Sequence, residues 1–286
     1  IGSNGMIGRY TRAALEILGH EVIGLVRRRI RASDIVDDYS QMTNSQQWLE
    51  HLKGIDVVIN AVGVLRNTPK TPMTAIHYLA PKALFEACEK MQIAKVIQIS
   101  ALGVDTVNPT LYQSSKLKAD EYLMQSQLNW TILRPSVVFA PDGASAKMFL
   151  FLSRLPIVSL PGKGQMRLQP VHIQDIVAVI LASIENKSST RRKIINCVGA
   201  KVVSYKAMLA SYALQQGKGV PLFIPIPLFL MSLTAKLTAL HPDIPLEPDT
   251  LKMLLEGSAA STAGIAEVLG HEPISIDDFI ATSKKL

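Results

Sequence analysis

Short runs rich in valine and isoleucine alternate with amphipathic stretches through the first half of the chain. Strands and helices in this alternation favour parallel pairing, with helices on both faces of the sheet. A near-continuous apolar run such as Val57–Ile59 fits a sheet buried on both sides. We therefore predict an α/β fold with a Rossmann-type, doubly wound parallel sheet. The expected strands are Glu21–Val26, Asp56–Val62, Lys95–Ser100 and Trp130–Arg134, and the expected helices are Met6–Leu18, Ala75–Met91 and Tyr112–Gln125.

The second half of the chain has a different pattern, because prolines become frequent after about residue 140. We expect a Rossmann domain over residues 1–140, completed by elements near 171–185, and a smaller, mostly helical, substrate-binding lobe over residues 141–286. The chain opens at Ile1, directly before a glycine-rich motif. We therefore expect a start methionine and most of a first strand to precede it. Later elements are expected at Asp175–Ile184, Ser204–Gln215 and Asp249–Glu256 as helices and at Lys193–Val198 as a strand.

Composition excludes several classes of protein. Hydrophobic residues make up 48% of the 286, which is enough for a core and rules out a disordered chain. Two cysteines, Cys88 and Cys197, exclude a disulfide scaffold, and the six histidines show no metal-ligand spacing, so we expect no metal. The net charge of +7 suits anionic ligands. Because the basic residues are scattered rather than clustered in a stripe, we expect no nucleic acid as a partner.

The first seven residues after Ile1 form a Gly-x-x-Gly-x-x-Gly motif. Glycine adopts backbone angles that other residues avoid, lets a pyrophosphate approach the backbone closely and lets a helix pack tightly on a strand. The amino end of the following helix adds free N–H groups and a positive dipole end. The motif predicts a phosphate-binding turn, with a plain glycine-rich turn as the alternative. The expected cofactor contacts are Gly2, Asn4, Gly5, Met6, Ile7 and Gly8.

Arginines follow Glu21–Val26, which is the second strand if the one expected before Ile1 is counted as the first. At this place an acidic residue would select NAD by binding the adenine ribose. Arg27 and Arg28 stand at this place, and no acid occurs before Asp34. A guanidinium donates two parallel hydrogen bonds to a phosphate, so it suits the extra phosphate of NADP. We predict NADP(H) as the cofactor, with NAD(H) less favoured; a solvated loop is the alternative reading of the arginines. Small residues after the third strand would let the dinucleotide cross the strand ends, at Ala61, Val62 and Gly63.

Tyr112 and Lys116 are four residues apart and share a face if they lie on a helix. A nearby ammonium favours phenolate, so we expect the pKa of Tyr112 to fall from about 10 toward neutrality. Such a phenol exchanges the proton that accompanies hydride transfer at a carbonyl, and the lysine can also hold the nicotinamide ribose. Tyr78 and Lys82 have the same spacing. We favour Tyr112 because it follows the fourth strand and opens a helix.

These motifs together resemble the short-chain dehydrogenase/reductase superfamily, in its extended or atypical branch. The set is most similar to NAD(P)-binding proteins related to the 39-kDa accessory subunit of respiratory complex I. The resemblance implies a bound dinucleotide, Tyr112 as general acid/base, Lys116 as its helper, and Pro135 and Val138 beside the nicotinamide. It rests on the glycine turn, Asn60–Gly63, Ile99–Gly103, Tyr112–Lys116, Arg134–Phe139 and Leu168–Ile176.

One departure from the family pattern follows the fourth strand. Active members place a serine or threonine one or two positions beyond Ser100 to bind the substrate carbonyl, and this chain has Ala101 and Leu102 there. Ser100 substitutes as a catalytic donor only if its side chain faces the pocket. Loss of one oriented donor lowers a rate by about 10²-fold.

Two functions follow from these patterns. The first is NADPH-dependent hydride transfer to or from a small carbonyl or hydroxyl substrate, in the cytoplasm. The second is a catalytically weak or inactive NADPH-binding scaffold or redox sensor, docked on a membrane or respiratory complex at the inner face of a membrane. Val220–Leu233 is too short and proline-rich to span a bilayer but offers an apolar docking patch. A membrane-associated partner, or a membrane region beyond Leu286, belongs to this second reading; the oligomeric state is left open.

Overall fold

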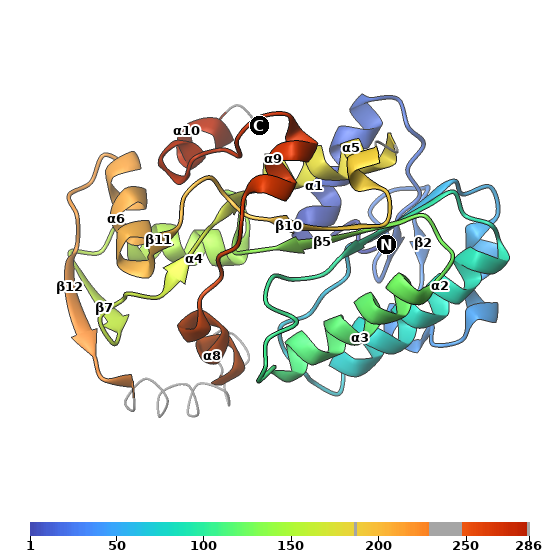
Figure 1. Ribbon diagram of the computed structural model, residues 1–286, viewed down its shortest axis with the longest axis horizontal. Coiled ribbons are helices and arrows are strands. Elements are labelled where there is room, and N and C mark those ends of the chain that lie inside the picture. The colour runs from blue at the N-terminus through green and yellow to red at the C-terminus, as the bar shows by residue number, and fades with distance from the viewer. Residues whose placement is uncertain (186–187, 229–247, 285–286) are drawn as a thin grey trace. The chain divides into compact units, whose positions relative to one another are not determined.

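A computed structural model describes residues 1–185, 188–228 and 248–284 of the chain. The chain divides into two compact units (Figure 1). The first contains residues 1–135, 174–197 and 264–271, and the second contains residues 136–173, 198–263 and 272–286. The first stretch of the first unit runs to Pro135, and the later stretch 174–197 contributes the last strand of its sheet.

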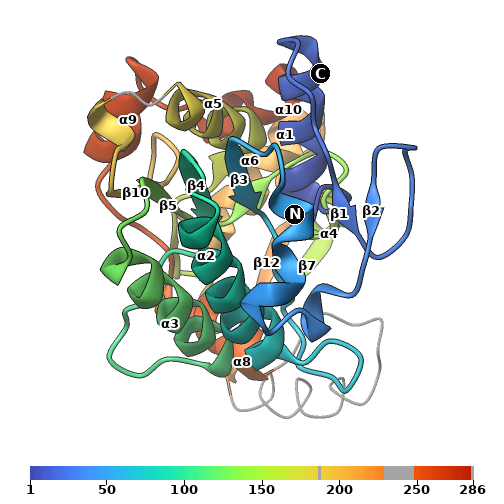
Figure 2. The ribbon, with the colours of Figure 1, turned by 90° about the vertical axis from the view of Figure 1, so that its right-hand side faces the viewer.

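The first unit is built on a parallel sheet. Its strands lie in the order β10, β5, β4, β3, and every neighbouring pair is parallel (Figure 2). In register, Val57 lies opposite Lys95, and Val96 opposite Trp130. The strands are β3 (Val57–Asn60), β4 (Lys95–Ile99), β5 (Trp130–Pro135) and β10 (Lys193–Cys197).

Ile1 connects this sheet to two further short strands. Its backbone nitrogen donates to the Ile59 carbonyl at 2.8 Å, and the Ala61 N–H donates to the Ile1 carbonyl at 3.2 Å. On its other side, the Gly2 N–H donates to the Leu25 carbonyl at 3.1 Å. Leu25 belongs to β1 (Leu25–Val26), which pairs in parallel with β2 (Ile35–Val36). The order is thus β2, β1, Ile1, β3, β4, β5, β10, which confirms the predicted doubly wound α/β fold.

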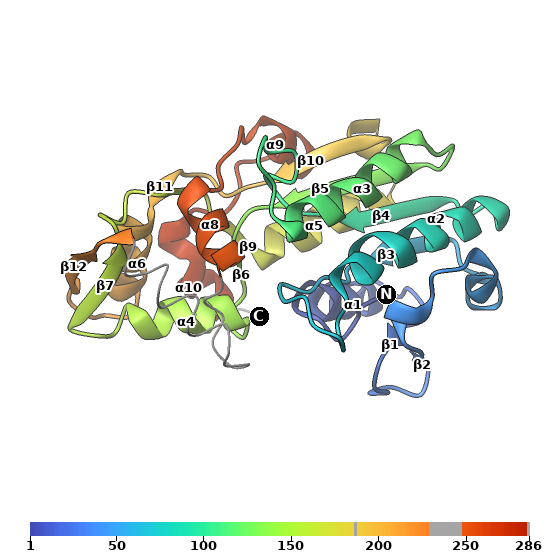
Figure 3. The same ribbon diagram turned by 90° about the horizontal axis from the view of Figure 1, so that it is seen from below.

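Helices cover both faces of the sheet. Helices α2 (Ala80–Lys90) and α3 (Leu111–Gln125) lie alongside each other on one face (Figures 2 and 3). Helices α1 (Met6–Ile17) and α5 (Ile173–Ile184) lie on the other. Helix α9 (Ala263–Leu269), the π-helical turn η4 (Ala75–Leu79) and 3-10 turns η1 (Tyr39–Gln41), η2 (Ser45–Trp48), η3 (Glu50–Leu52) and η5 (Ser188–Thr190) complete this unit.

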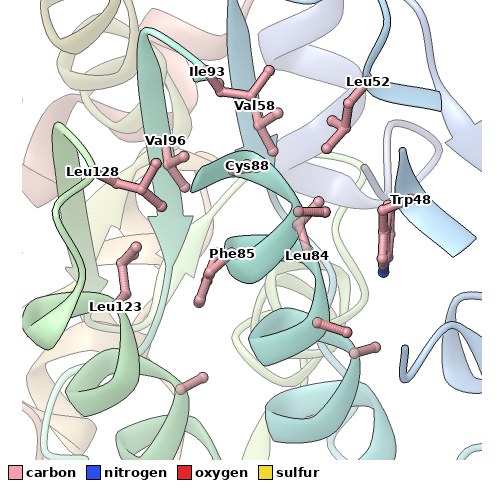
Figure 4. Close-up of a cluster of buried hydrophobic side chains, with 14 of the residues drawn as sticks. Trp48, Leu52, Val58, Leu84, Phe85, Cys88, Ile93, Val96, Leu123 and Leu128 are labelled. Atoms are coloured by element: carbon pink, nitrogen blue, oxygen red, sulfur yellow. The ribbon is translucent and has the colours of Figure 1, made fainter. Parts of the chain in front are cut away.

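The main core of the first unit fills the space between β3, β4, α2 and α3 (Figure 4). Leu84, Phe85 and Cys88 on α2 are fully buried against Val96 of β4. Trp48 closes one side of the cluster, and its indole N–H donates to the Met42 carbonyl at 3.0 Å. Each large apolar side chain buried here contributes about 1.5–3 kcal/mol. This core holds α3 on the sheet and so fixes the helix that carries Tyr112 and Lys116.

The second unit combines helices with short strand pairs. Its core includes Phe139, whose ring centroid lies 5.3 Å from that of Tyr212 and 5.1 Å from that of Phe279. Strand pairs are β6 (Val138–Phe139) with β9 (Val171–His172), β7 (Ile157–Pro161) with β12 (Leu222–Ile226), and β8 (Arg167–Leu168) with β11 (Val203–Ser204). The helices are α4 (Ala144–Leu152), α6 (Tyr205–Gln215), α8 (Pro248–Glu256), α10 (Phe279–Ser283) and the 3-10 turn η6 (Ile276–Asp278).

Every expected helix is present with ends that shift by one or two residues, apart from the π-helical opening of the Ala75–Met91 stretch. The strand predicted at Glu21–Val26 is reduced to Leu25–Val26. Residues 20–23 and Leu25 instead line a cavity of about 600 Å³, to which residues 55–59 also contribute. Helix α4 and the strand pairs of the second unit were not predicted, because their apolar runs are short.

No described helix has both the length and the apolar character needed to span a bilayer. The apolar stretch Val220–Leu233 contains β12, and its last residues, from 229 onward, lie outside the described part of the chain.

Candidate functional site

The glycine motif forms a tight turn between Ile1 and α1. Gly2 has a φ of +72°, in the left-handed region, and a Cβ there would lie 2.9 Å from Val62 Cγ2. A Cβ on Gly8 would lie 2.2 Å from the Gly2 carbonyl oxygen and 2.8 Å from the Ser3 Cα. The turn therefore packs against the end of β3 and against the first turn of α1, and a side chain fits at neither position.

The amino end of α1 is open to an anion. Gly5 precedes the helix, and no side chain caps it. The Gly5 N–H donates back to the Gly2 carbonyl at 2.9 Å, which closes the turn. The backbone N–H groups of Met6, Ile7 and Gly8 in the first turn have no acceptor within the helix. Free N–H groups and the positive end of the helix dipole suit a diphosphate, so these residues fit the predicted cofactor contacts.

The arginine loop is tied to this turn. Asn4 Nδ2 donates to the Arg28 carbonyl at 3.1 Å, and the side chains of Arg27 and Arg28 are exposed. Asp34, the first acid after β1, is buried and accepts from Arg12 Nη1 at 2.5 Å. It also accepts from the N–H groups of Ile30 at 3.0 Å and Arg31 at 2.9 Å. The carboxylate that could bind a ribose is thus occupied in shaping the loop.

The Asp34 ion pair predicts a pH-dependent contribution to stability. Burial opposes ionisation, but the bonds from Arg12 and the two N–H groups hold the pKa of Asp34 below its ordinary value of 3.8. A depressed pKa stabilises the fold above that value, and the benefit is lost as the pH falls through the folded pKa. Asp34→Asn should therefore cost about 3 kcal/mol of unfolding free energy near neutral pH, because Arg12 stays buried and keeps only the partly exposed Glu16, at 3.0 Å, as a charge partner.

Urea unfolding of wild type and Asp34→Asn at several pH values measures this difference. The gap should close as the pH drops below the ordinary pKa of an aspartate, about 4. Asp37→Asn, a substitution at a half-exposed carboxylate directly after β2, is the matched control and should cost under about 0.5 kcal/mol. A gap for Asp34→Asn that does not change with pH would contradict the assignment.

Tyr112 and Lys116 lie in the first turns of α3, which begins at a capping box made by Thr110 and Gln113. Lys116 Nζ donates to the Ile99 carbonyl at 2.9 Å, at the end of β4, and lies 5.7 Å from the centre of the Tyr112 ring. A Cβ on Gly63 would lie 3.5 Å from Lys116 Nζ. The structure thus places this pair at the carboxyl ends of β3 and β4, where doubly wound sheets bind ligands.

The expected fall in the pKa of Tyr112 is wrong. Burial raises the pKa of the Tyr112 phenol to about 12 and lowers the pKa of the Lys116 ammonium to about 8. The sequence shows the spacing of the two groups but not their loss of solvent, which disfavours the charged form of each. Tyr112 is therefore a protonated phenol at neutral pH, suited to donating a proton.

In the competing pair, Tyr78 and Lys82, the lysine has partners other than the tyrosine. Lys82 Nζ forms an ion pair with Glu86 at 2.6 Å, one helical turn away, and lies 5.2 Å from the centre of the Tyr122 ring. Tyr122 also donates to Glu86, at 3.1 Å. Here the lysine belongs to a partly exposed surface network on α2 and α3.

Ser100 lies at the end of β4 with its hydroxyl engaged by another side chain. It is buried, and its hydroxyl donates to Asp120 Oδ2 at 2.7 Å. Arg134 also contacts Asp120, at 3.3 Å, and reaches Asp105 at 2.7 Å. Burial raises the pKa of Asp120 to about 6, against the opposing bonds from Ser100 and Arg134. The Ser100 hydroxyl thus donates to a network inside the first unit, and its role as a catalytic residue stays a prediction.

The structure adds a residue that the sequence did not single out. His77 on η4 is buried, and its ring lies edge-on to the Tyr112 ring with centroids 5.3 Å apart. A lone histidine in an apolar run carries no signal of this contact. Of the other predicted residues, Ala61 touches the glycine turn, Pro135 ends β5, and Val138 begins β6 in the second unit. The roles of Pro135 and Val138 beside a nicotinamide stay predictions.

No three described His, Cys, Asp or Glu side chains gather as metal ligands would. What the first unit offers is a doubly wound sheet whose crossover point holds a glycine turn, an uncapped helix and a Tyr/Lys pair. These features define a dinucleotide-binding α/β protein.

The chain belongs to the NAD(P)H-binding family, whose pattern matches residues 2–151. Its sequence is distantly similar to curated subunits of mitochondrial NADH dehydrogenase. Subunit 9 of the NADH dehydrogenase (ubiquinone) 1 alpha subcomplex from Arabidopsis thaliana is 25% identical over 204 residues, which are 67% of this chain and 51% of that protein. Photosystem II assembly factor Ycf39 from Cyanophora paradoxa is 29% identical over 140 residues, 47% of this chain and 43% of that protein. The chain spans between 29% and 60% of the curated relatives that it matches.

Solved structures share the fold along the whole chain. A nucleoside-diphosphate-sugar epimerase from Staphylococcus aureus has a TM-score of 0.77 at 16% identity, covering 98% of this chain and 97% of its own. A short-chain dehydrogenase/reductase superfamily protein from Agrobacterium tumefaciens, solved with bound NAD, has a TM-score of 0.73 at 16% identity, covering 99% of this chain and 94% of its own. At these identities the likeness concerns the fold alone.

Proposed function

We propose that this protein is an NADPH-dependent oxidoreductase that transfers hydride to or from a small carbonyl or hydroxyl substrate. The observation that carries the proposal is the placement of Tyr112 and Lys116. Lys116 Nζ is bonded to the end of β4 and lies beside Gly63, which follows β3. A proton donor and a cation thus stand at the strand ends, on the same sheet edge as the glycine turn.

The nicotinamide, when bound, supplies or accepts the hydride at the substrate carbon. In the reducing direction the Tyr112 hydroxyl donates its proton to the carbonyl oxygen, so that carbon and oxygen each gain one hydrogen and an alcohol forms. The phenolate left on Tyr112 is stabilised by the Lys116 ammonium. The Ile99 carbonyl accepts from Lys116 Nζ at 2.9 Å and holds that ammonium in place.

The preference for NADPH over NADH rests on the loop after β1. Arg27 and Arg28 are exposed, and their side chains form no hydrogen bond or ion pair among the described residues. Asp34, which would repel an added phosphate, is neutralised by Arg12 at 2.5 Å. A charge-assisted bond from an arginine to phosphate is worth about 1.5–3 kcal/mol.

Replacing both Arg27 and Arg28 by alanine should weaken NADPH binding about a hundredfold while NADH binding changes little. Isothermal titration of both coenzymes measures this. Arg191→Ala removes an exposed arginine just before β10 and is the matched control, with both affinities unchanged. A wild-type protein that binds NADH as tightly as NADPH would refute the cofactor preference.

A second candidate function is an NADPH-binding scaffold or redox sensor that docks on a membrane or respiratory complex, at the inner face of that membrane. Two observations favour it. Ala101 and Leu102 supply no hydroxyl after Ser100, whose own is engaged by Asp120. In the second unit, strands β7 and β12 expose Ile157 at 52%, Leu222 at 63% and Ile224 at 46%. Tight, slowly exchanging NADPH without turnover on any carbonyl tried would support this candidate over the first.

A further inference from the structure

We propose that His77 is a positioning residue, which fixes the loop after β3 against the Tyr112/Lys116 helix as a neutral ring protonated on Nδ1. This inference rests on the proposed function, since it concerns the same cofactor and proton-transfer site. It assigns a role to a side chain that touches neither the glycine turn nor, in the mechanism above, the substrate.

The ring bridges two segments far apart in the sequence. The Val64 N–H, just beyond Gly63, donates to His77 Nε2 at 3.0 Å. On the opposite side of the ring, Nδ1 lies 3.0 Å from Ser115 Oγ on α3. Both His77 and Ser115 are buried. The loop that follows β3 is thereby tied to the turn of helix that separates Tyr112 from Lys116.

The direction of each hydrogen bond follows from its donors. A backbone N–H only donates, so Nε2 must accept from Val64 and carry no proton. A neutral imidazole then holds its proton on Nδ1, which donates to Ser115 Oγ. The Ser115 hydroxyl in turn donates to the Tyr112 carbonyl at 3.1 Å. A directed chain of bonds therefore runs from Val64 through the ring to the backbone of the proposed catalytic tyrosine.

Electrostatics keep the ring in this form. Burial, and then the nearby Lys116 ammonium, lower the pKa of His77 to about 3. A second ring proton would also turn Nε2 into a donor facing the Val64 N–H. Two titratable side chains of the described residues lie beside His77: Tyr112, whose ring packs edge-on, and Lys116.

The backbone around His77 is π-helical. His77 lies in the π-helical turn η4, directly before α2. Such turns insert an extra residue into a helix and recur at functional sites. A Cβ on Gly63 would lie 4.0 Å from His77 Nε2 and 3.5 Å from Lys116 Nζ. The imidazole and the ammonium therefore flank the same exposed glycine, at the predicted nicotinamide end of the cofactor site.

Ring-nitrogen NMR of the coenzyme-free protein tests the tautomer without any ligand. We expect His77 to show a protonated Nδ1 and a bare Nε2, with no titration between about pH 5 and 8. The Val64 amide should be protected from hydrogen exchange. A proton on Nε2, or a ring that titrates in this range, would overturn the proposal.

Three variants test what the bond from Val64 to His77 and the bond from His77 to Ser115 each contribute to NADPH binding. His77→Phe loses both and should weaken NADPH binding about tenfold and leave the Val64 amide unprotected. His77→Gln places an oxygen near the Nε2 position, so it should restore both readouts to within about threefold. Ser115→Ala removes the α3 partner alone and should fall between them. His20→Phe, at an exposed histidine, is the control and should match wild type.

The outcomes distinguish this inference from the function on which it rests. If wild type binds no NADPH while the tautomer and the Val64 protection are as expected, the proposed function fails and the structural link stands. If wild type binds NADPH and folded His77→Phe binds it equally well, the positioning role is overturned and the proposed function stands. If His77→Phe does not fold, the NADPH affinities of Ser115→Ala and His77→Gln decide the positioning role in its place.

Discussion

Gly8→Ala should abolish coenzyme binding, lowering NADPH affinity by roughly a hundredfold or more, and should cost about 3 kcal/mol of stability. The added Cβ would lie 2.2 Å from the Gly2 carbonyl oxygen and 2.8 Å from the Ser3 Cα. Both obstacles are backbone, so no rotamer relieves the overlap and the turn itself must open. Opening it separates the first N–H groups of α1 from the site where a diphosphate would bind.

The measurement is a coenzyme titration together with urea unfolding. Gly264→Ala is the matched control, because Gly264 also lies near the start of a helix, α9, and has no atom within 4 Å of an added Cβ. It should leave binding unchanged and stability equal or slightly higher. If Gly8→Ala bound NADPH as wild type does, the turn would not be the phosphate site, and the cofactor assignment would fall with it.

The parts of this site that follow from local chemistry were predictable from sequence. The glycine spacing predicts the turn because backbone approach restricts each position to residues without a side chain. Tyr112 and Lys116 fall on one helix, which Thr110 opens as a cap. A run of charged residues is also evident from the sequence, so the arginines after β1 could be identified without a structure.

The parts that depend on tertiary contacts were not predictable. Ser100 is engaged by Asp120, and only the packing of α3 on β4 brings these two together. The pKa of Tyr112 rises rather than falls because burial disfavours the charged phenolate. His77 acquires its role through Val64 and Ser115, from two other segments. Spacing along the chain encodes which groups share a helix face, but neither their solvent exposure nor their partners elsewhere.

Tyr112→Phe should lower turnover on a carbonyl substrate by roughly a thousandfold while NADPH affinity stays within about threefold. The substitution removes the one hydroxyl that the mechanism uses and keeps the ring that packs against His77 at 5.3 Å. The phenol is protonated at neutral pH because burial raises its pKa to about 12, so what is lost is a proton donor to the carbonyl oxygen.

Single-turnover oxidation of bound NADPH, followed by its absorbance, separates this chemical step from binding. Tyr78→Phe is the matched control, since Tyr78 has the same spacing to a lysine, but that lysine pairs with Glu86 at 2.6 Å. It should react at the wild-type rate. An equal loss of rate in both variants would point to a general effect of removing a tyrosine hydroxyl. Full activity in Tyr112→Phe would contradict the role of Tyr112 as proton donor. A wild-type protein that holds NADPH yet reduces no carbonyl would instead favour the docked scaffold, because the missing hydroxyl at Ala101 and Leu102 would then be decisive.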